Sequence, residues 1–361
     1  MTVTMMDLGD RPAVAAVKAG GPSSDPGVLC PPQKFDYKIV KGFFVQNDPS
    51  IPRVAFEPTL LERNFGLVDT SPERWANLDR DVKRLQADAE DGVQYKVFFL
   101  GRHGQGWHNA AVDVIGVDPW EAYWTFQYGN DEFTWGPDPE LTPEGIRQAR
   151  EVCKVWKREK EFGAPVDKER MKWYVSPLTR TGQTMQESFQ ELLTGVPEVW
   201  EDWREIYGSH TCDLRSTRTQ IAERFPTFMI EKGFAEEDPL WTADYRETDK
   251  EMQIRSRRAF DRVFSEGGAE ELYVSITSHS AILRNVLAVL GHGPYPLQTG
   301  EMIPVVIKAT PVKQEQKVNG RSGTNGTNGP ADTNSNGVNG HAVNGQAGSN
   351  GHAYTNGVNG H

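Results

Sequence analysis

The chain has 361 residues, and its 39 lysines and arginines stand against 50 aspartates and glutamates, for a formal net charge of −11. We expect neither nucleic acid nor a membrane among its partners, because both attract proteins with a basic surface. Its three cysteines are scattered along the sequence, which excludes a disulfide framework.

The N-terminal segment 1–21 carries Asp7 and Asp10 where a secretion signal carries lysine or arginine, and it lacks a continuous apolar core. No apolar run in the sequence approaches the ~20 residues that span a bilayer. We therefore expect no secretion signal and a cytoplasmic protein, with a nuclear location also open.

The two ends of the chain differ in composition from its centre. Residues 1–34 are rich in Gly, Pro and Ala, and residues 313–361 repeat Asn-Gly with almost no apolar side chains. Such segments bury too little apolar surface to fold, so we expect both to be disordered. Between them the sequence predicts one domain, residues 35–312.

Within this domain, strand and helix patterns alternate. In chain order, the sequence predicts a strand at 94–100, a helix at 108–116, a helix from 143, a strand at 171–176, a helix at 180–193, a weaker strand within 197–206, a helix at 249–267, a strand at 272–279, a helix at 281–291 and a strand at 303–309. Thr142 and Pro143 are typical of a helix N-cap and of the first helical position. This alternation predicts an α/β fold, a three-layer αβα sandwich with a mostly parallel central sheet.

Polar side chains follow three of the predicted strands, at the points where the strands end. The three junctions contain Arg102, His103, His108 and Asn109; then Arg180; then His279. In an open α/β sheet, ligands bind beyond the carboxyl ends of the strands, so we expect these side chains to converge. Arginines, imidazoles and the helix N-termini that begin there suit a phosphoryl group, whose oxygens need donors through the transition state.

The pair Arg102-His103 also has a consequence for protonation. A neighbouring cation disfavours the imidazolium, which keeps His103 neutral and nucleophilic at pH 7. A proton donor for the leaving alcohol is then needed, and the acidic segment after the weaker strand offers Glu205, with Glu201 as the alternative. His210 lies in the same segment and, like His108, is a candidate for lining the substrate pocket.

Four motifs carry a family resemblance. They are Arg-His-Gly at 102–104 with Asn109 six positions beyond the histidine, Ser-Pro-Leu-x-Arg-x-x-Gln-Thr at 176–184, Glu205 after a later strand, and Ser-His-Ser at 278–280. In their order and separation they resemble the histidine phosphatase superfamily, also called the phosphoglycerate mutase-like family. The segment 203–216, "WREIYGSHTCDLRS", resembles its fungal phosphomutase-like branch. Gln105 departs from the pattern, because glutamate is common at this position in the family.

The resemblance implies a role for each matching residue. His103 accepts the phosphoryl group as a phosphohistidine, and Glu205 protonates the leaving oxygen and then activates water. The residues that hold the phosphate are Arg102, Arg180 and His279, with Asn109 as a further contact. The resemblance thus implies a metal-independent phosphatase that acts on a small-molecule phosphate monoester and needs no cofactor. A phosphomutase that uses the same histidine, or a non-catalytic protein that binds phosphorylated ligands, are the alternatives.

Two interpretations of the residues beyond these motifs also bear on the site. His103, His108 and Asp113 are residue types that bind metals, but the adjacent arginine repels a cation, so we expect no metal. The aromatic-rich segment 119–138 fits either a helix packed on the rim of the sheet or a lid over the phosphate site. The sequence leaves these two open.

Overall fold

The structure, a computed structural model, describes residues 33–50, 60–166, 171–189, 192–193, 195–268 and 270–312. The predicted N-terminal extension, apart from its last two residues, and the predicted Asn-Gly tail lie outside the described residues.

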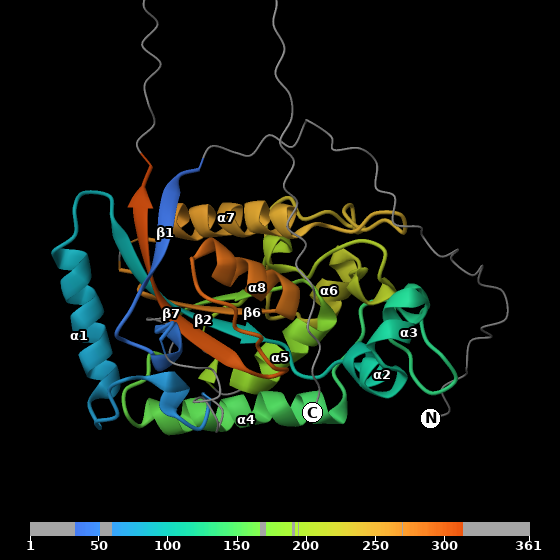
Figure 1. Cartoon of the computed structure of the whole chain (residues 1–361), viewed down its shortest axis with the longest axis horizontal. Helices are drawn as coiled ribbons and strands as arrows, with labels where there is room; N and C mark the ends of the chain where they lie inside the picture. Colours follow the sequence, from blue (N-terminus) through green and yellow to red (C-terminus); the bar gives the residue numbers. More distant parts are fainter. Residues whose placement is uncertain are drawn as a thin grey trace, which may run out of the picture. The chain divides into compact units, whose positions relative to one another are not determined.

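A seven-stranded sheet forms the centre of the domain (Figure 1). Across the sheet the strands are β1 (Phe35–Val40), β7 (Met302–Pro311), β2 (Gln94–Arg102), β6 (Tyr273–Ser278), β3 (Met171–Val175), β4 (Glu198–Val199) and β5 (Met229–Ile230). Strand β7 is antiparallel to both β1 and β2, whereas the pairs from β2 through β6, β3 and β4 to β5 are parallel. The predicted mostly parallel sheet is confirmed.

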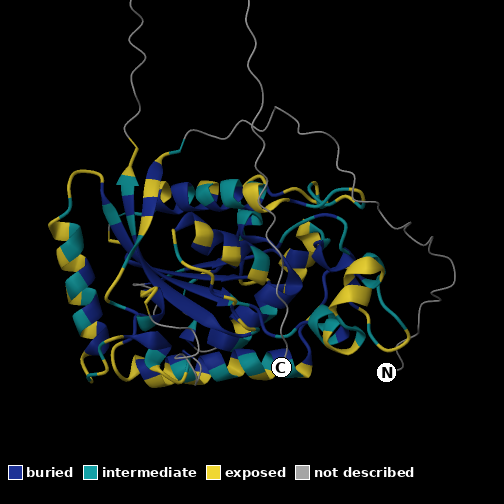
Figure 2. Ribbon diagram, in the orientation of Figure 1, coloured by how far each residue is buried: buried dark blue, intermediate teal, exposed yellow. Residues whose placement is uncertain are grey.

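Helices cover both faces of this sheet, as the sequence predicts for a three-layer sandwich. They are α1 (Arg74–Ala87), α2 (Trp107–Ile115), α3 (Val117–Ala122), α4 (Pro143–Lys160), α5 (Thr179–Phe189), α6 (Arg218–Arg224), α7 (Asp249–Glu266) and α8 (Ser280–Val289). Figure 1 shows α4 along one side of the sheet and α7 along the other, and in Figure 2 the strands between them are buried. Within the described residues, no helix is both long enough and apolar enough to cross a membrane.

Strand β2 shows how the two faces divide the core. Val97 and Phe99 pack with residues of α1, α4 and α5, whereas Phe98 and Leu100 pack with residues of α7 and α8. All four side chains are fully buried. Alternate side chains of a strand point to opposite faces, so a strand covered by helices on both sides must be apolar throughout. The run "VFFL" meets that requirement.

Helix α4 begins as its sequence predicts. The Thr142 side chain accepts a hydrogen bond from the Gly145 amide at 3.1 Å, and Pro143 occupies the first helical position. The weaker strand predicted within 197–206 is shorter than expected. Only Glu198–Val199 pair in the sheet, and the chain then turns through a 3-10 helix at Glu201–Trp203.

Candidate active site

Three neighbouring parallel strands end side by side at the site. Strand β6 lies between β2 and β3, with Arg102 opposite Ser278 and Val175 opposite Thr277. The ladder extends one residue further, because the His103 amide donates to Ser278 O at 3.0 Å and the Ser176 amide donates to Thr277 O at 3.1 Å. The register of the sheet therefore brings His103, His279 and Ser176 together at one edge.

His103 is buried, and its hydrogen bond defines the tautomer of its ring. Its Nδ1 lies 2.6 Å from Gly104 O. A carbonyl oxygen only accepts, so Nδ1 carries the proton and Nε2 keeps its lone pair. Burial lowers the pKa of His103 well below the usual value, and the charges of Arg180 and Arg102 lower it further. The ring is therefore neutral at pH 7, and its Nε2 lone pair is free.

The turn that holds His103 is fixed by close contact with the start of α4. A Cβ atom on Gly104 would lie 2.3 Å from Gly145 O, and one on Gly145 would lie 2.1 Å from Gln105 O. The Gly104 amide donates to Thr184 Oγ1 at 3.0 Å. Gln105, the departure from the family pattern, accepts a 2.8 Å hydrogen bond from the Thr142 hydroxyl, so it joins this turn to α4.

His279 lies beside His103, with the ring centroids 5.0 Å apart. Its Nε2 is 2.7 Å from Ser176 Oγ, which also accepts the Leu178 amide at 3.3 Å. The hydroxyl proton of Ser176 is thus available for Nε2, and the proton of the neutral imidazole then sits on Nδ1. Burial lowers the pKa of His279 well below its usual value, as does the charge of Arg180.

Four buried nitrogen atoms around His103 have no hydrogen-bond partner among the described residues: Arg102 Nε, Arg180 Nε, His108 Nδ1 and His279 Nδ1. Buried polar groups normally have partners, because leaving one unpaired costs about 1–3 kcal/mol. Both arginines are held from elsewhere, Arg102 by Leu297 O at 2.8 Å and Arg180 by Cys212 O at 2.9 Å. Unpaired, buried N–H groups of two guanidiniums next to a neutral imidazole suit an anionic ligand.

Glu205 sits at the N-terminus of α8. Its carboxylate accepts the amides of Ala281 and Ile282, each at 3.2 Å, and its own neighbour Ile206 at 2.9 Å. Burial raises the pKa of Glu205, and the nearby charge of Asp213 raises it further. A raised pKa favours the protonated form of the carboxyl group, which is the form that a proton donor needs.

Glu201, the alternative acid, is engaged elsewhere. Its carboxylate pairs with Arg204 at 2.8 Å and with Arg215 at 3.0 Å, and both guanidiniums are buried. This double ion pair makes Glu201 a structural residue. The geometry favours Glu205 as the proton donor.

Asp213 forms ion pairs with two arginines, Arg180, which follows strand β3, and Arg246. Its two carboxylate oxygens pair with Arg180 at 3.0 Å and with Arg246 at 2.9 Å. Although burial opposes its charge, Arg246 and Arg180 hold the pKa of Asp213 below the usual value. Sequence reasoning missed Arg246, which lies in an irregular segment without a motif, and it also missed Ser176 as the partner of His279.

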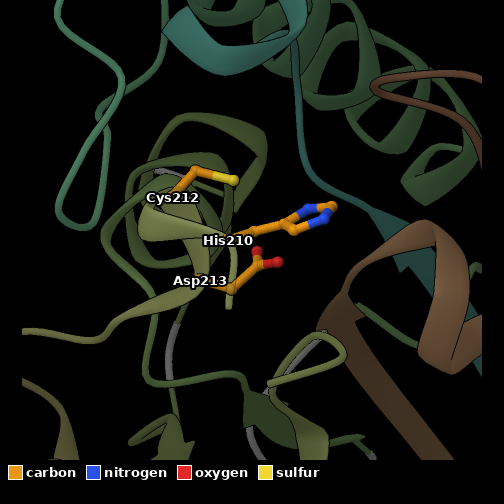
Figure 3. A group of neighbouring side chains, drawn as sticks. All are labelled: His210, Cys212 and Asp213. Carbon is orange, nitrogen blue, oxygen red and sulfur yellow. The ribbon is translucent and has the colours of Figure 1, made fainter. Parts of the chain in front are cut away.

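Figure 3 shows Asp213 with His210 and Cys212, whose ligand atoms lie within 4.8 Å of one another. This spacing alone would suit a metal ion. However, two guanidiniums already neutralise Asp213, and burial raises the pKa of the Cys212 thiol. A bound cation would have to displace the arginines and deprotonate the thiol, so the chemistry of this cluster fits a cation poorly.

The remaining predicted residues lie at the edge of the site. His108 is 5.5 Å from His103 between ring centroids, and burial lowers its pKa well below the usual value. His210 is 3.6 Å from Glu121, and burial together with the charge of Arg246 lowers its pKa to about 4. Asn109 Oδ1 accepts the Gly106 amide at 3.0 Å and so caps α2. Its contact with phosphate stays a prediction.

Comparison with known proteins matches residues 120–304 to the model of the histidine phosphatase superfamily (branch 1). The chain belongs to this superfamily. The match includes Arg180, Glu205 and His279, and it begins after His103.

Histidine phosphatase superfamily relatives from fungi cover more of the chain. A probable phosphoglycerate mutase of Arthroderma benhamiae is 35% identical over 75% of this chain and 84% of its own length. Phosphomutase-like protein 3 of Candida albicans is 36% identical over 75% of this chain and 79% of its own length. Among solved structures, a phosphoglycerate mutase from Bacillus anthracis superposes with a TM-score of 0.37, at 14% identity over 60% of this chain and 89% of that chain.

Proposed function

We propose that the protein is a metal-independent phosphatase that hydrolyses an organic phosphate monoester through a phosphohistidine at His103. One observation carries this proposal. His103 keeps a lone pair on Nε2, and the neighbouring residues Arg102, Arg180 and His279 each have a buried nitrogen atom that lacks a partner among the described residues. These donors supply the electrostatic stabilisation that phosphoryl transfer requires.

In the first step, Nε2 of His103 attacks the phosphorus, and the bond from phosphorus to the ester oxygen breaks. The electron pair of that bond goes to the leaving oxygen, which takes the proton from Glu205. The raised pKa of Glu205 favours the protonated form that this step requires. The alcohol leaves, and the phosphoryl group is held on His103.

In the second step, water attacks the phosphorus, and the bond from phosphorus to Nε2 breaks. The Glu205 carboxylate takes a proton from the water, so Glu205 is again protonated and His103 is again neutral. Inorganic phosphate then leaves, and the cycle consumes one water molecule per ester. The arginines carry the charge of the phosphoryl group in both steps.

A phosphomutase is the second candidate, because the fungal relatives are named as a probable phosphoglycerate mutase and a phosphomutase-like protein. The two activities share the first step. A mutase returns the phosphoryl group from His103 to a retained alcohol, whereas a phosphatase transfers it to water.

The test is release of inorganic phosphate from a panel of monoesters, with and without EDTA, for the wild type and for His103→Ala. We expect release that resists EDTA and falls by at least about a thousandfold in the variant, the scale seen when a covalent nucleophile is lost. Transfer to an added alcohol without phosphate release would favour the mutase. Binding without any turnover would favour a phospho-ligand-binding protein, and loss of activity in EDTA would contradict the metal-independent mechanism.

A further inference from the structure

The segment that joins β2 to α4 has an unusual composition. Residues 103–142 contain seven acidic side chains and no lysine or arginine. The acids are Asp113, Asp118, Glu121, Asp131, Glu132, Asp138 and Glu140. The same residues include eight aromatic side chains: Trp107, Trp120, Tyr123, Trp124, Phe126, Tyr128, Phe133 and Trp135. Trp120, Trp135 and Asp138 are buried within the protein, so the other side chains of this segment are the ones that can face a ligand.

Contacts place this segment against the site. Cys212, next to Asp213, packs in one apolar cluster with Ala111 of α2, Trp120 of α3 and Trp135. The Phe126 ring lies edge-on to the His210 ring, with centroids 6.1 Å apart. The segment therefore forms a wall of the site, next to the residues that hold Arg180.

Two of the acids of this segment lie close to residues of the site. Glu121 of α3 reaches His210, with Oε2 3.6 Å from Nε2, and its side chain is 58% exposed. Asp113 of α2 accepts a hydrogen bond from Gln105 Nε2 at 3.2 Å. Burial lowers the pKa of Arg102, and Asp113 is among the charges that oppose this shift, as expected of a carboxylate near that guanidinium.

The arginines of the site are already partly neutralised. Asp213 lies between Arg180 and Arg246 and cancels one of their charges. Arg246 also donates to Gly208 O at 2.7 Å, so its guanidinium is held within the protein. The positive charge that remains suits one phosphoryl group. The acidic segment supplies no positive charge that could bind a second anionic group.

We infer that the alcohol part of the substrate is uncharged or cationic and carries an aromatic or apolar body. The site discriminates against monoesters with a second anionic group, such as a carboxylate, close to the phosphate. This inference rests on the proposed function, since it concerns the leaving group of that reaction. A phosphoglycerate, whose carboxylate lies near its phosphate, is by this reasoning a poor substrate for this chain.

Three aryl phosphates test this inference about the leaving group. They are phenyl phosphate, 4-carboxyphenyl phosphate and the methyl ester of 4-carboxyphenyl phosphate, which has nearly the same shape but lacks the carboxylate charge. We expect kcat/KM for the carboxylate to be about tenfold or more below that of its methyl ester, the effect of about 1.4 kcal/mol of repulsion. Glu121→Lys should lower the ratio of kcat/KM for the methyl ester to kcat/KM for the carboxylate. The milder Glu121→Gln should lower this ratio less.

The control is Glu151→Lys, which makes the same change of charge on the outer face of α4, where Glu151 pairs with Lys154 and is 44% exposed. It should leave the ratio unchanged. Equal kcat/KM for the carboxylate and its methyl ester, or a ratio that Glu121→Lys does not move, would overturn the inference while leaving the phosphatase proposal standing. If none of the three esters shows hydrolysis dependent on His103, the proposed function fails, and the inference fails with it.

Discussion

The two imidazoles at the centre of the site differ in which nitrogen is free. His103 donates from Nδ1 to Gly104 O and keeps a free lone pair on Nε2, whereas His279 contacts Ser176 through Nε2 and has an unpaired Nδ1. The difference arises from the partner of each ring, which is a backbone carbonyl for His103 and the Ser176 hydroxyl for His279. This arrangement fits the proposed mechanism, in which His103 attacks and His279 donates a hydrogen bond to the phosphoryl group.

Glu205→Gln tests the proton donor. An amide cannot give a proton to the leaving oxygen, so kcat for an alkyl phosphate should fall about 10²- to 10⁴-fold. A 4-nitrophenyl ester, whose leaving oxygen needs little protonation, should lose much less in the step that forms the phosphohistidine. Glu201→Gln is the matched control and should not show this dependence on the leaving group in single-turnover assays. Equal losses for both esters in Glu205→Gln would contradict its role as the acid.

Asp213→Asn tests the residue that holds Arg180. Loss of a charged partner costs about 1.5–3 kcal/mol, so KM should rise about tenfold or more. The pH dependence of the activity should also shift. The charge of Asp213 raises the pKa of Glu205, and Glu205 works in its protonated form, present below that pKa. Without Asp213 the pKa falls, and activity should be lost at a lower pH on the alkaline side.

The control for Asp213→Asn is Glu159→Gln, which removes another buried acid, paired with Arg74 at 2.8 Å on the far part of α4. That variant should lose stability without moving the pH profile. An unchanged alkaline limb in Asp213→Asn would contradict the electrostatic link to Glu205.

At the scale of elements, the site depends on the contact between the turn after β2 and the first turn of α4. Gly104 and Gly145 meet so closely that neither tolerates a Cβ atom without movement. Sequence reasoning found the start of α4 from Thr142 and Pro143, but it had no means to show that this helix supports the turn of His103. That contact joins segments about 40 residues apart, and only the packed structure reveals it.

Gly104→Ala should therefore lower both stability and activity. The added methyl group would overlap the Gly145 carbonyl, and overpacking of this kind costs typically about 1–3 kcal/mol. Chemical denaturation and kcat/KM measure the two effects. Gly293→Ala is the control, because a Cβ atom there meets nothing within 4 Å. Equal effects of the two substitutions would show that the close contact is not what matters.

The strand-end motifs could be found in the sequence because a buried strand followed at once by polar residues is a local pattern. Arg102, His103 and His279 belong to such patterns, and the sheet order then places them together. The choice between Glu201 and Glu205 was open, since it depends on ion pairs with Arg204 and Arg215 that are not local. Helix α1 was missed although Trp75, Leu78 and Val82 are spaced for one buried face.

At the scale of the whole molecule, the buried imidazoles make the free energy of unfolding depend on pH. His103, His108 and His279 are buried, and their pKa values are lowered well below the ordinary value in the folded state. A lowered folded pKa gives stability that is present above the unfolded pKa of about 6.5 and is lost as pH falls below it. Glu205 and Glu231, whose pKa values are raised, oppose this trend, whereas His210, whose pKa is lowered to about 4, adds to it.

We therefore expect the free energy of unfolding to fall by more than about 2 kcal/mol between pH 7 and pH 5, at up to about 1.4 kcal/mol per pH unit for each histidine. Urea denaturation at several pH values measures it. His108→Asn should reduce the slope of the free energy of unfolding against pH by the contribution of about one bound proton. A stability that is constant or rises toward pH 5 would contradict the burial of neutral imidazoles.

The measurement that tests the central claim most directly is a search for the phosphorylated protein during turnover. The protein is mixed with a reactive monoester and quenched in alkali, where phosphohistidine survives, and the modified residue is mapped by mass spectrometry of its peptides. The account predicts a phosphoryl group on His103 that forms at the rate of the first step and is absent in His103→Asn. Steady turnover with no phosphoryl group on His103, or with one on another residue, would contradict it.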